Sequence, residues 1–194
     1  MTNRKIILAS QSKQRYKLFK TLNLPFVVQP ADIDEHVIKA SAEAKRAELV
    51  AIAKAKEVIK KNKKAIVVAA DTYGLLEDQV LEKPTSKEKA IKMLKLLSNK
   101  EFLALTGFCY LDPVNKISYS TTKQVKTKFR DLSIEEIEFY VESEPVLTWS
   151  ASFSPAYDSG MALIETIQGS FTAFTHGLPI EDLTRLLRKS GVYE

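Results

Sequence analysis

The 194-residue sequence predicts an α/β fold in which helices flank a mixed β-sheet. Residues 65–70 form a continuous apolar run rich in β-branched side chains, which is typical of a strand covered on both faces. Residues 101–111 and 117–129 have the composition of two long strands joined as a hairpin. Ahead of these strands, residues 41–61 repeat small apolar side chains at helical spacing. Strands that alternate with amphipathic helices define the α/β class.

The amino-terminal segment predicts a strand, a tight turn and a helix start. The apolar run at residues 6–8 ends near Ser10 and Ser12, and a basic, helix-compatible segment follows at residues 13–22. Ser12 suits the N-cap position, because its hydroxyl can accept a hydrogen bond from a free backbone N–H of the first turn. The remaining free N–H groups of such a turn attract anions, and phosphate is the anion we expect.

A cluster of carboxylates precedes the helix at residues 41–61. Asp32, Asp34 and Glu35 fall on one short segment. They could hold a hard cation such as Mg²⁺, or they could be the acidic first turn of the next helix, and both interpretations stay open here. Within that helix Lys54 lies near the apolar face. Its ammonium group either extends past the core to solvent or faces a binding site.

Asp71 directly follows the buried strand at residues 65–70. Ligands of α/β proteins bind at the carboxyl ends of such strands, and a carboxylate there is costly unless it meets a cation or hydrogen-bond donors. We therefore interpret Asp71 as functional. Lys83 precedes Pro84 and a capping-box pattern at residues 85–88 that predicts a helix start. Phosphate contact and plain surface exposure both remain open for Lys83.

The carboxyl-terminal third predicts further local structure. Ser133 and Glu136 form a capping box that opens a short helix. Residues 148–159 are polar, aromatic and irregular, and residues 161–167 read as a strand. Residues 177–191 contain the final helix, with basic residues in its last turn and a glycine suited to its C-cap.

Composition favours one globular domain over residues 1–194. The chain is 45% hydrophobic and 27% charged, which is ordinary for a folded protein, and no Gly/Ser/Pro-rich linker divides it. The net charge of +5 favours anionic partners such as nucleotides. The basic stretch at residues 54–64 lacks the interleaved aromatic residues that bind nucleic acid, so we expect no nucleic-acid partner.

The sequence also indicates a reducing compartment. The single cysteine, Cys109, lies in an apolar run and reads as a small buried side chain. No apolar run approaches the ~20 residues of a membrane span, and the amino terminus lacks the apolar core of a signal peptide. We therefore expect a cytoplasmic protein without a membrane partner.

Taken together, these segments resemble the Maf family of nucleotide pyrophosphatases. Several short motifs of that family occur in the same order over nearly the whole chain. They are a LASxSPRR-like opening at residues 8–15, IDE at 33–35, an AxxKA-type segment at 53–55, ADT at 70–72, VLxKP at 80–84, TG at 106–107, the phenylalanine of VxF at 129, GS at 169–170 and GLP at 177–179. Each motif alone is weak, but their order is specific.

The resemblance implies a fold similar to that of inosine triphosphate pyrophosphatases, with a twisted mixed sheet and two lobes around a central cleft. It implies hydrolysis of a non-canonical or pyrimidine nucleoside triphosphate, ribo- or deoxyribo-, to the monophosphate and pyrophosphate. It further implies a divalent cation, Mg²⁺ or alternatively Mn²⁺, and a homodimer. The matching positions are Asp71, Glu35 and Lys83 as catalytic residues, Asp71 and Glu35 as metal ligands, and Ser10, Ser12, Arg15, Lys54 and Thr72 as substrate-binding residues.

The chain departs from the family pattern in two places. Gln14 stands where the family has an arginine, and residues 149–157 read WSASFSPAY where the family has DKAGxYxIQ. The Asp, Lys and Gln of that segment are therefore absent from their expected positions. These departures motivate an alternative function, a nucleotide-binding protein with reduced or lost hydrolysis that acts as a sensor or interaction module.

Overall fold

A computed structural model describes residues 4–77 and 79–193 of the chain. The chain divides into two compact units. Unit 1 comprises Met1–Thr72, Thr106–Lys123 and His176–Glu194, and unit 2 comprises Tyr73–Leu105 and Gln124–Thr175. The prediction of one domain over the whole chain stays a prediction, and we describe each unit by itself.

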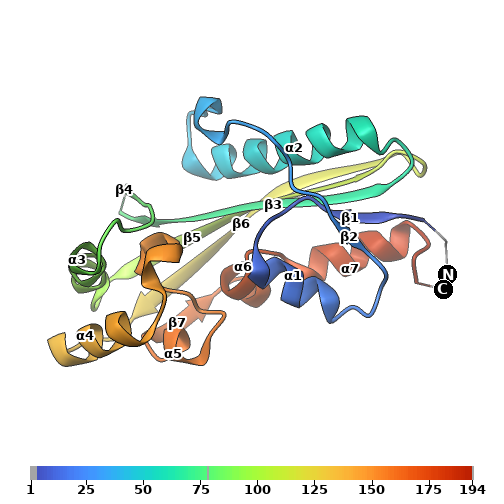
Figure 1. Cartoon of the computed structure of the whole chain (residues 1–194). Helices are drawn as coiled ribbons and strands as arrows, with labels where there is room; N and C mark the ends of the chain where they lie inside the picture. Colours follow the sequence, from blue (N-terminus) through green and yellow to red (C-terminus); the bar gives the residue numbers. More distant parts are fainter. Residues whose placement is uncertain (1–3, 78, 194) are drawn as a thin grey trace. The chain divides into compact units, whose positions relative to one another are not determined.

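Within the described residues, the strands form one seven-stranded sheet in the order β2-β1-β3-β5-β6-β7, with β4 paired to β3 (Figure 1). The strands are β1 (Ile6–Leu8), β2 (Val27–Val28), β3 (Ile66–Leu76), β4 (Gln79–Leu81), β5 (Glu101–Asp112), β6 (Ile117–Phe129) and β7 (Ile164–Gln168). β1 runs parallel to β2 and β3, whereas β4 is antiparallel to β3 and β7 is antiparallel to β6. The predicted mixed sheet is therefore confirmed. The sequence at residues 77–80 predicts a hairpin turn, and Asp78 of that turn lies outside the described residues.

In unit 1, helices cover both faces of strands β1 and β3 (Figure 1). On one face, Ile7 and Val67 pack with Ala51 of α2 (Glu43–Lys61). On the other face, Leu8 and Val68 pack with apolar residues of α1 (Lys13–Lys20) and α7 (Ile180–Lys189). Because successive residues of a strand point to opposite faces, a strand covered on both sides needs an unbroken apolar sequence.

Gly107 in β5 brings α2 close to the sheet. A Cβ atom placed on Gly107 would lie 2.0 Å from the backbone oxygen of Ala47 in α2, which no real side chain tolerates. The glycine of the TG pair therefore permits direct contact between a helix backbone and a strand backbone. Small residues on the inner face of α2, such as Ala47 and Ala51, serve the same close packing.

Unit 2 has its own apolar core. Its helices are α3 (Lys87–Leu97), α4 (Ile134–Ser143), α5 (Asp158–Met161) and most of α6 (Phe171–His176), with two 3-10 turns, η2 (Val146–Thr148) and η3 (Ser150–Ser152). Phe102, Phe129 and Phe153 contact one another edge to face at the centre of this core. Ser133 caps α4 in the predicted capping box with Glu136, which is confirmed.

The segment at residues 149–157 belongs to that core. Phe153 is buried in it, and Trp149 stacks on Tyr157 with ring centroids 5.3 Å apart. The Tyr140 hydroxyl accepts a hydrogen bond from the Ser154 backbone N–H at 3.3 Å. The substituted segment is therefore well packed.

Two local predictions were wrong. The N-cap of α3 is Ser86, whose hydroxyl accepts from the backbone N–H of Lys89, so the predicted capping box of Thr85 with Glu88 does not begin this helix. Thr85 and Ser86 are both favoured at N-caps, and the spacing of Thr85 to Glu88 pointed to Thr85. The predicted strand at 161–167 begins only at Ile164, because Met161 ends the short helix α5.

Candidate functional site

The turn between β1 and α1 is held by the two serines singled out in the sequence. Ser12 is the N-cap of α1, as predicted, and its hydroxyl accepts from the Arg15 backbone N–H at 3.3 Å. The backbone N–H of Ser12 donates to Ser10 Oγ at 3.1 Å. Gln14 joins this turn, because its Oε1 accepts from Ser12 Oγ at 3.3 Å. Hydroxyl groups thus surround the start of α1, where the helix dipole favours an anion.

Arg15 ties this turn to two distant segments of unit 1. Its Nη1 donates to Ser10 Oγ at 3.2 Å, its Nη2 to Thr72 Oγ1 at 2.9 Å, and its Nε to the Gly177 carbonyl at 2.9 Å. Thr72 Oγ1 in turn lies 3.2 Å from the hydroxyl of Thr106. The rigid fork of the guanidinium suits such multiple contacts. Much of its donor capacity is therefore directed at protein groups.

Burial also affects the charge of Arg15. Desolvation lowers the pKa of its guanidinium below the ordinary value, and the nearby carboxylates of Asp71 and Glu35 raise it and offset part of that effect. The ordinary pKa of arginine is so high that the side chain stays charged. Arg15 therefore adds a fixed positive charge to this part of unit 1.

Gly177 is required by this arrangement. Its φ is +64°, a left-handed conformation that L side chains rarely adopt. A Cβ atom there would lie 2.6 Å from Thr72 Oγ1 and 3.2 Å from Arg15 Nε. The glycine of the GLP motif thus leaves room for the Arg15 and Thr72 side chains.

A second cluster centres on Lys54 of α2. Its Nζ lies 2.9 Å from Glu35 Oε1 and 2.9 Å from Asp71 Oδ1. The side chains of Lys54 and Asp71 retain 13% and 14% of their exposure, whereas Glu35 retains 43%. Of the two interpretations given for Lys54, the structure supports the one in which it faces a polar site. One ammonium group thus joins carboxylates from two separate segments.

Glu35 stands on η1 (Glu35–Val37), a 3-10 turn ahead of α2. Asp34 caps this turn, because its Oδ1 accepts from the His36 backbone N–H at 2.9 Å. The acidic cluster therefore begins η1, and the first-turn alternative for the helix at 41–61 is wrong, since α2 starts only at Glu43. The local hydrogen bonds of Asp34 leave Glu35 as the carboxylate that meets Lys54.

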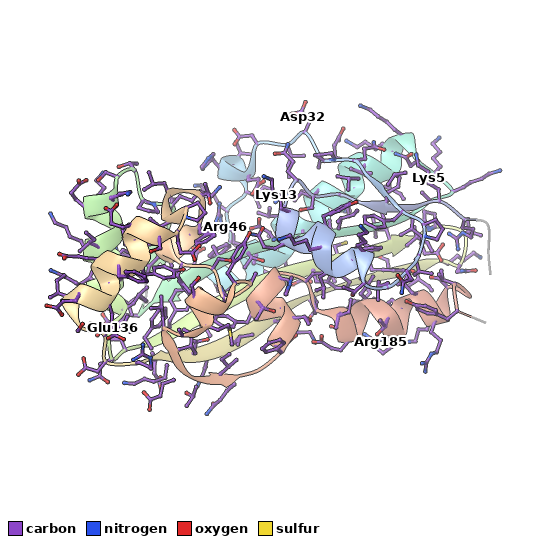
Figure 2. The ribbon with its side chains drawn as sticks, turned by 60° about the horizontal axis from the view of Figure 1, so that its bottom comes forward. Lys5, Lys13, Asp32, Arg46, Glu136 and Arg185 are labelled. Carbon is purple, nitrogen blue, oxygen red and sulfur yellow. The ribbon has the colours of Figure 1, made fainter. Side chains whose placement is uncertain are left out.

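Arg46 is a residue of this region that the sequence reasoning missed. It lies on α2 and is labelled in Figure 2. Its Nε donates to the Ile38 carbonyl at 3.1 Å, and its Nη2 to the Glu35 carbonyl at 3.4 Å. The available signal was its spacing, because Arg46, Val50 and Lys54 follow one another at four-residue intervals and so share one side of the helix.

The two clusters flank the same stretch of β3. Asp71 and Thr72 are consecutive, so one side chain points to the α2 face and the other to the α1 face. The placement of Asp71 at the carboxyl end of its strand was wrong, because β3 continues to Leu76. The last β1–β3 pair is Leu8↔Val68, however, so Asp71 lies beyond the point where β1 ends.

Seven predicted site residues therefore gather in unit 1. They form two groups, Ser10, Ser12, Arg15 and Thr72 in the first, and Glu35, Lys54 and Asp71 in the second. The eighth, Lys83, belongs to unit 2 and lies two residues beyond the end of β4 at Leu81. Its role stays a prediction that rests on its motif.

The second cluster has the chemistry of a partial cation site. Carboxylate oxygens of Glu35 and Asp71 converge on one positive charge, and Mg²⁺ is bound in proteins through one or two carboxylates with substrate phosphates and water. Residues 4–77 and 79–193 contain no group of three or more His, Cys, Asp or Glu side chains placed to hold a metal ion by themselves. A cation here therefore needs ligands from its substrate or solvent.

The fold and the two clusters together define an α/β protein with hydroxyl, cationic and acidic groups near the carboxyl end of β1. Folds of this class hold ligands at the carboxyl ends of their strands. The chain belongs to the Maf-like protein family, whose model matches residues 5–190. The family resemblance drawn from the motifs is confirmed.

Curated relatives span the same length. A dTTP/UTP pyrophosphatase from Ruminiclostridium cellulolyticum is 36% identical over 187 residues, which cover 96% of each chain. A dTTP/UTP pyrophosphatase from Aquifex aeolicus is 34% identical and covers 95% of each chain. A 7-methyl-GTP pyrophosphatase from Nitrosococcus oceani is 30% identical, covering 96% of this chain and 93% of the relative.

Solved structures support the fold. The Ham1 protein from Staphylococcus aureus matches with a TM-score of 0.53 and 18% identity, covering 96% of this chain and all of that one (100%). A HAM1 protein from Coxiella burnetii matches with a TM-score of 0.51 and 17% identity, covering 96% of this chain and 99% of that one.

No helix in the described part of the chain is long and apolar enough to cross a membrane.

Proposed function

We propose that this protein is a nucleoside triphosphate pyrophosphatase. Water hydrolyses the anhydride bond between the α and β phosphates. The oxygen of water bonds to phosphorus, the bridging P–O bond breaks, and the products are a nucleoside monophosphate and pyrophosphate. The observation that carries the proposal is the position of Lys54, 2.9 Å from both Glu35 and Asp71, in a chain of the Maf-like family. Positive and negative groups at one point suit a substrate that arrives as a metal–phosphate complex.

A divalent cation, Mg²⁺ or alternatively Mn²⁺, is proposed to bind Glu35 and Asp71. When bound, it would polarise a phosphoryl oxygen and lower the pKa of a coordinated water. Lys54 would then donate to a phosphate oxygen and neutralise part of its charge. Either carboxylate could accept the proton of the attacking water, since both are within reach of the same point.

The first cluster is proposed to hold phosphate oxygens. The hydroxyls of Ser10, Ser12 and Thr72 and the start of α1 can donate to an anion. Arg15 contributes positive charge and orients two of these hydroxyls, because it donates to Ser10 and Thr72. Lys83 is proposed to contact phosphate on the strength of its motif, and Lys83→Gln should then raise the KM for the nucleotide.

Pyrimidine triphosphates are the proposed substrates, because two of the relatives above are named dTTP/UTP pyrophosphatases. The relative named for 7-methyl-GTP gives the second substrate to test. A cytoplasmic homodimer is part of the same proposal, and size-exclusion chromatography with light scattering tests the dimer.

The proposal is tested with a panel of triphosphates. Purified protein is incubated with dTTP, UTP, 7-methyl-GTP and the other common nucleotides, with Mg²⁺, Mn²⁺ or a chelator, and pyrophosphate is separated from phosphate. We expect pyrophosphate and monophosphate in equal amounts, only with the metal, and at least about a hundredfold less with Asp71→Asn. Glu57→Gln is the matched control, because Glu57 is a carboxylate of the same helix, α2, whose Oε2 pairs with Lys60 at 2.8 Å.

Two outcomes would contradict the proposal. Release of phosphate instead of pyrophosphate would indicate cleavage at another bond. Stabilisation by a nucleotide in a thermal-shift assay without product would favour the alternative, a nucleotide-binding sensor or interaction module, for which the changed segment at residues 149–157 is the motivation.

A further inference from the structure

We propose that Arg46 is a positioning residue that sets the location of the Glu35 carboxylate for cation binding. The inference rests on the proposed function, because it takes Glu35 as a metal ligand. Arg46 acts on the backbone that carries Glu35.

The contacts of Arg46 enclose the whole of η1. Its Nη2 donates to the carbonyl of the first residue of the turn, Glu35, and its Nε to the carbonyl of the residue that ends it, Ile38. The Ile38 backbone N–H also donates to the Glu35 carbonyl at 3.3 Å. One guanidinium therefore binds the carbonyl groups at both ends of a single turn.

Helix α2 fixes Glu35 twice. Arg46 holds its backbone, and Lys54 holds its carboxylate at 2.9 Å. The two contacts respond differently to metal binding. A cation that binds the Glu35 carboxylate competes with Lys54 for it, whereas the backbone contact of Arg46 is not in competition. The Arg46 contact does not involve the carboxylate, so it still ties η1 to α2 at that stage. Without it, Glu35, which is 43% exposed, has much freedom to move into solvent.

Arginine suits this role better than lysine. Reaching two carbonyl groups at once requires donors that diverge from a planar head group, which arginine has and the single ammonium of lysine lacks. Arg46 also lies 4.0 Å from Glu43 Oε2, a long pair at the start of α2 that adds little. The informative contacts are those to η1.

A merely structural role makes a different prediction. If Arg46 only stabilised the fold, its replacement would lower the melting temperature and leave the metal affinity of folded protein unchanged. If it positions Glu35, replacement weakens metal binding in folded protein. Groups that orient metal ligands typically contribute about 10- to 100-fold in metal affinity.

The test compares Arg46→Gln, Arg46→Lys and the control Lys60→Gln with the wild type. Lys60 is an exposed cation of the same helix, 70% exposed and paired with Glu57. Mn²⁺ binding is followed by the electron paramagnetic resonance signal of free Mn²⁺, in the presence of a non-hydrolysable triphosphate analogue of the substrate. Hydrogen exchange of the Ile38 amide reports on η1 directly.

We expect Arg46→Gln to weaken Mn²⁺ binding about tenfold and to speed exchange of the Ile38 amide, with Arg46→Lys in between and Lys60→Gln unchanged. Faster exchange with unchanged Mn²⁺ affinity would overturn the proposal, and so would a wild type that binds no Mn²⁺. Hydrolysis is scored separately. A wild type without turnover whose Mn²⁺ binding still depends on Arg46 would refute the proposed function and leave this inference standing.

Discussion

Asp71 and Thr72 are neighbours in β3, yet they accept hydrogen bonds from different basic side chains. Asp71 Oδ1 accepts from Lys54 at 2.9 Å, and Thr72 Oγ1 accepts from Arg15 at 2.9 Å. Because their side chains leave opposite faces of the strand, one peptide unit connects the two clusters. Any shift of β3 at this point therefore moves an acidic group and a hydroxyl group together.

Lys54→Met tests the competition between an internal cation and a metal ion. Without the ammonium group, Glu35 and Asp71 lose their positive partner, so Mn²⁺ should bind the nucleotide-free protein more tightly, on the order of tenfold. Turnover should fall at the same time, since Lys54 no longer neutralises phosphate. Calorimetry and steady-state kinetics measure the two effects, and weaker metal binding in the variant would refute the explanation.

Arg15→Lys keeps the charge and removes the fork. A single ammonium cannot reach Ser10, Thr72 and the Gly177 carbonyl together, so we expect a loss of about 2 kcal/mol in the free energy of unfolding and a higher KM for the nucleotide. Urea denaturation gives the first quantity and initial rates the second. Lys13→Gln, at an exposed position of the same helix, is the control.

Gly177→Ala should disturb the same group from the other side. The methyl group would meet Thr72 Oγ1 at 2.6 Å in a backbone conformation that disfavours any side chain. We expect a loss of about 1–3 kcal/mol in the free energy of unfolding. We also expect lower turnover, without any tightening of nucleotide binding. Gly191→Ala is the control, because Gly191 also has a positive φ but lies just after α7. Both variants should lose stability in urea denaturation, and only Gly177→Ala should also lose turnover.

Asp112 predicts the acid sensitivity of unit 1. Burial raises the pKa of this carboxyl, but hydrogen bonds from Arg4, Ser190 and Asn115 outweigh that effect and hold the pKa at about 2. A folded-state pKa below the ordinary value stabilises the protein above pH ~4, and this contribution is lost as the pH falls from ~4 towards ~2.

Asp112→Asn should therefore cost about 2 kcal/mol at pH 7, and the difference from the wild type should shrink towards pH 2. Urea denaturation at several pH values measures this, with the exposed Asp131→Asn as the control. A constant difference across the pH range would show that the variant acts through lost packing.

Much of the fold followed from local sequence signals. The unbroken apolar run of β3, the N-cap at Ser12 and the capping box at Ser133 each depend on a few consecutive residues, so the sequence states them directly. The cap of α3 was misplaced because Thr85 and Ser86 compete for the same position. Both residue types are favoured at N-caps, so a short local pattern does not decide between them.

The candidate site was less accessible to sequence reasoning. The motifs named the seven residues that the structure brings together in unit 1. Their contacts were not predicted, because the partners of Arg15 lie far away along the chain, with Gly177 separated from it by 162 positions. Arg46 was missed because its contacts are to backbone carbonyls, which carry no residue identity. For a contact of that kind, the sequence shows the side chain of the donor and nothing that identifies the acceptor.

Gly107 carries no charge and belongs to neither cluster, yet it determines how closely α2 approaches β5. Arg46 and Lys54 ride on that helix, so a methyl group at position 107 would push both cations away from the sheet at once. A homologue could therefore retain every charged residue named here and still bind metal and nucleotide poorly, if its strand lacked this glycine. Glycine at this position therefore belongs beside the acidic and basic residues when relatives are compared.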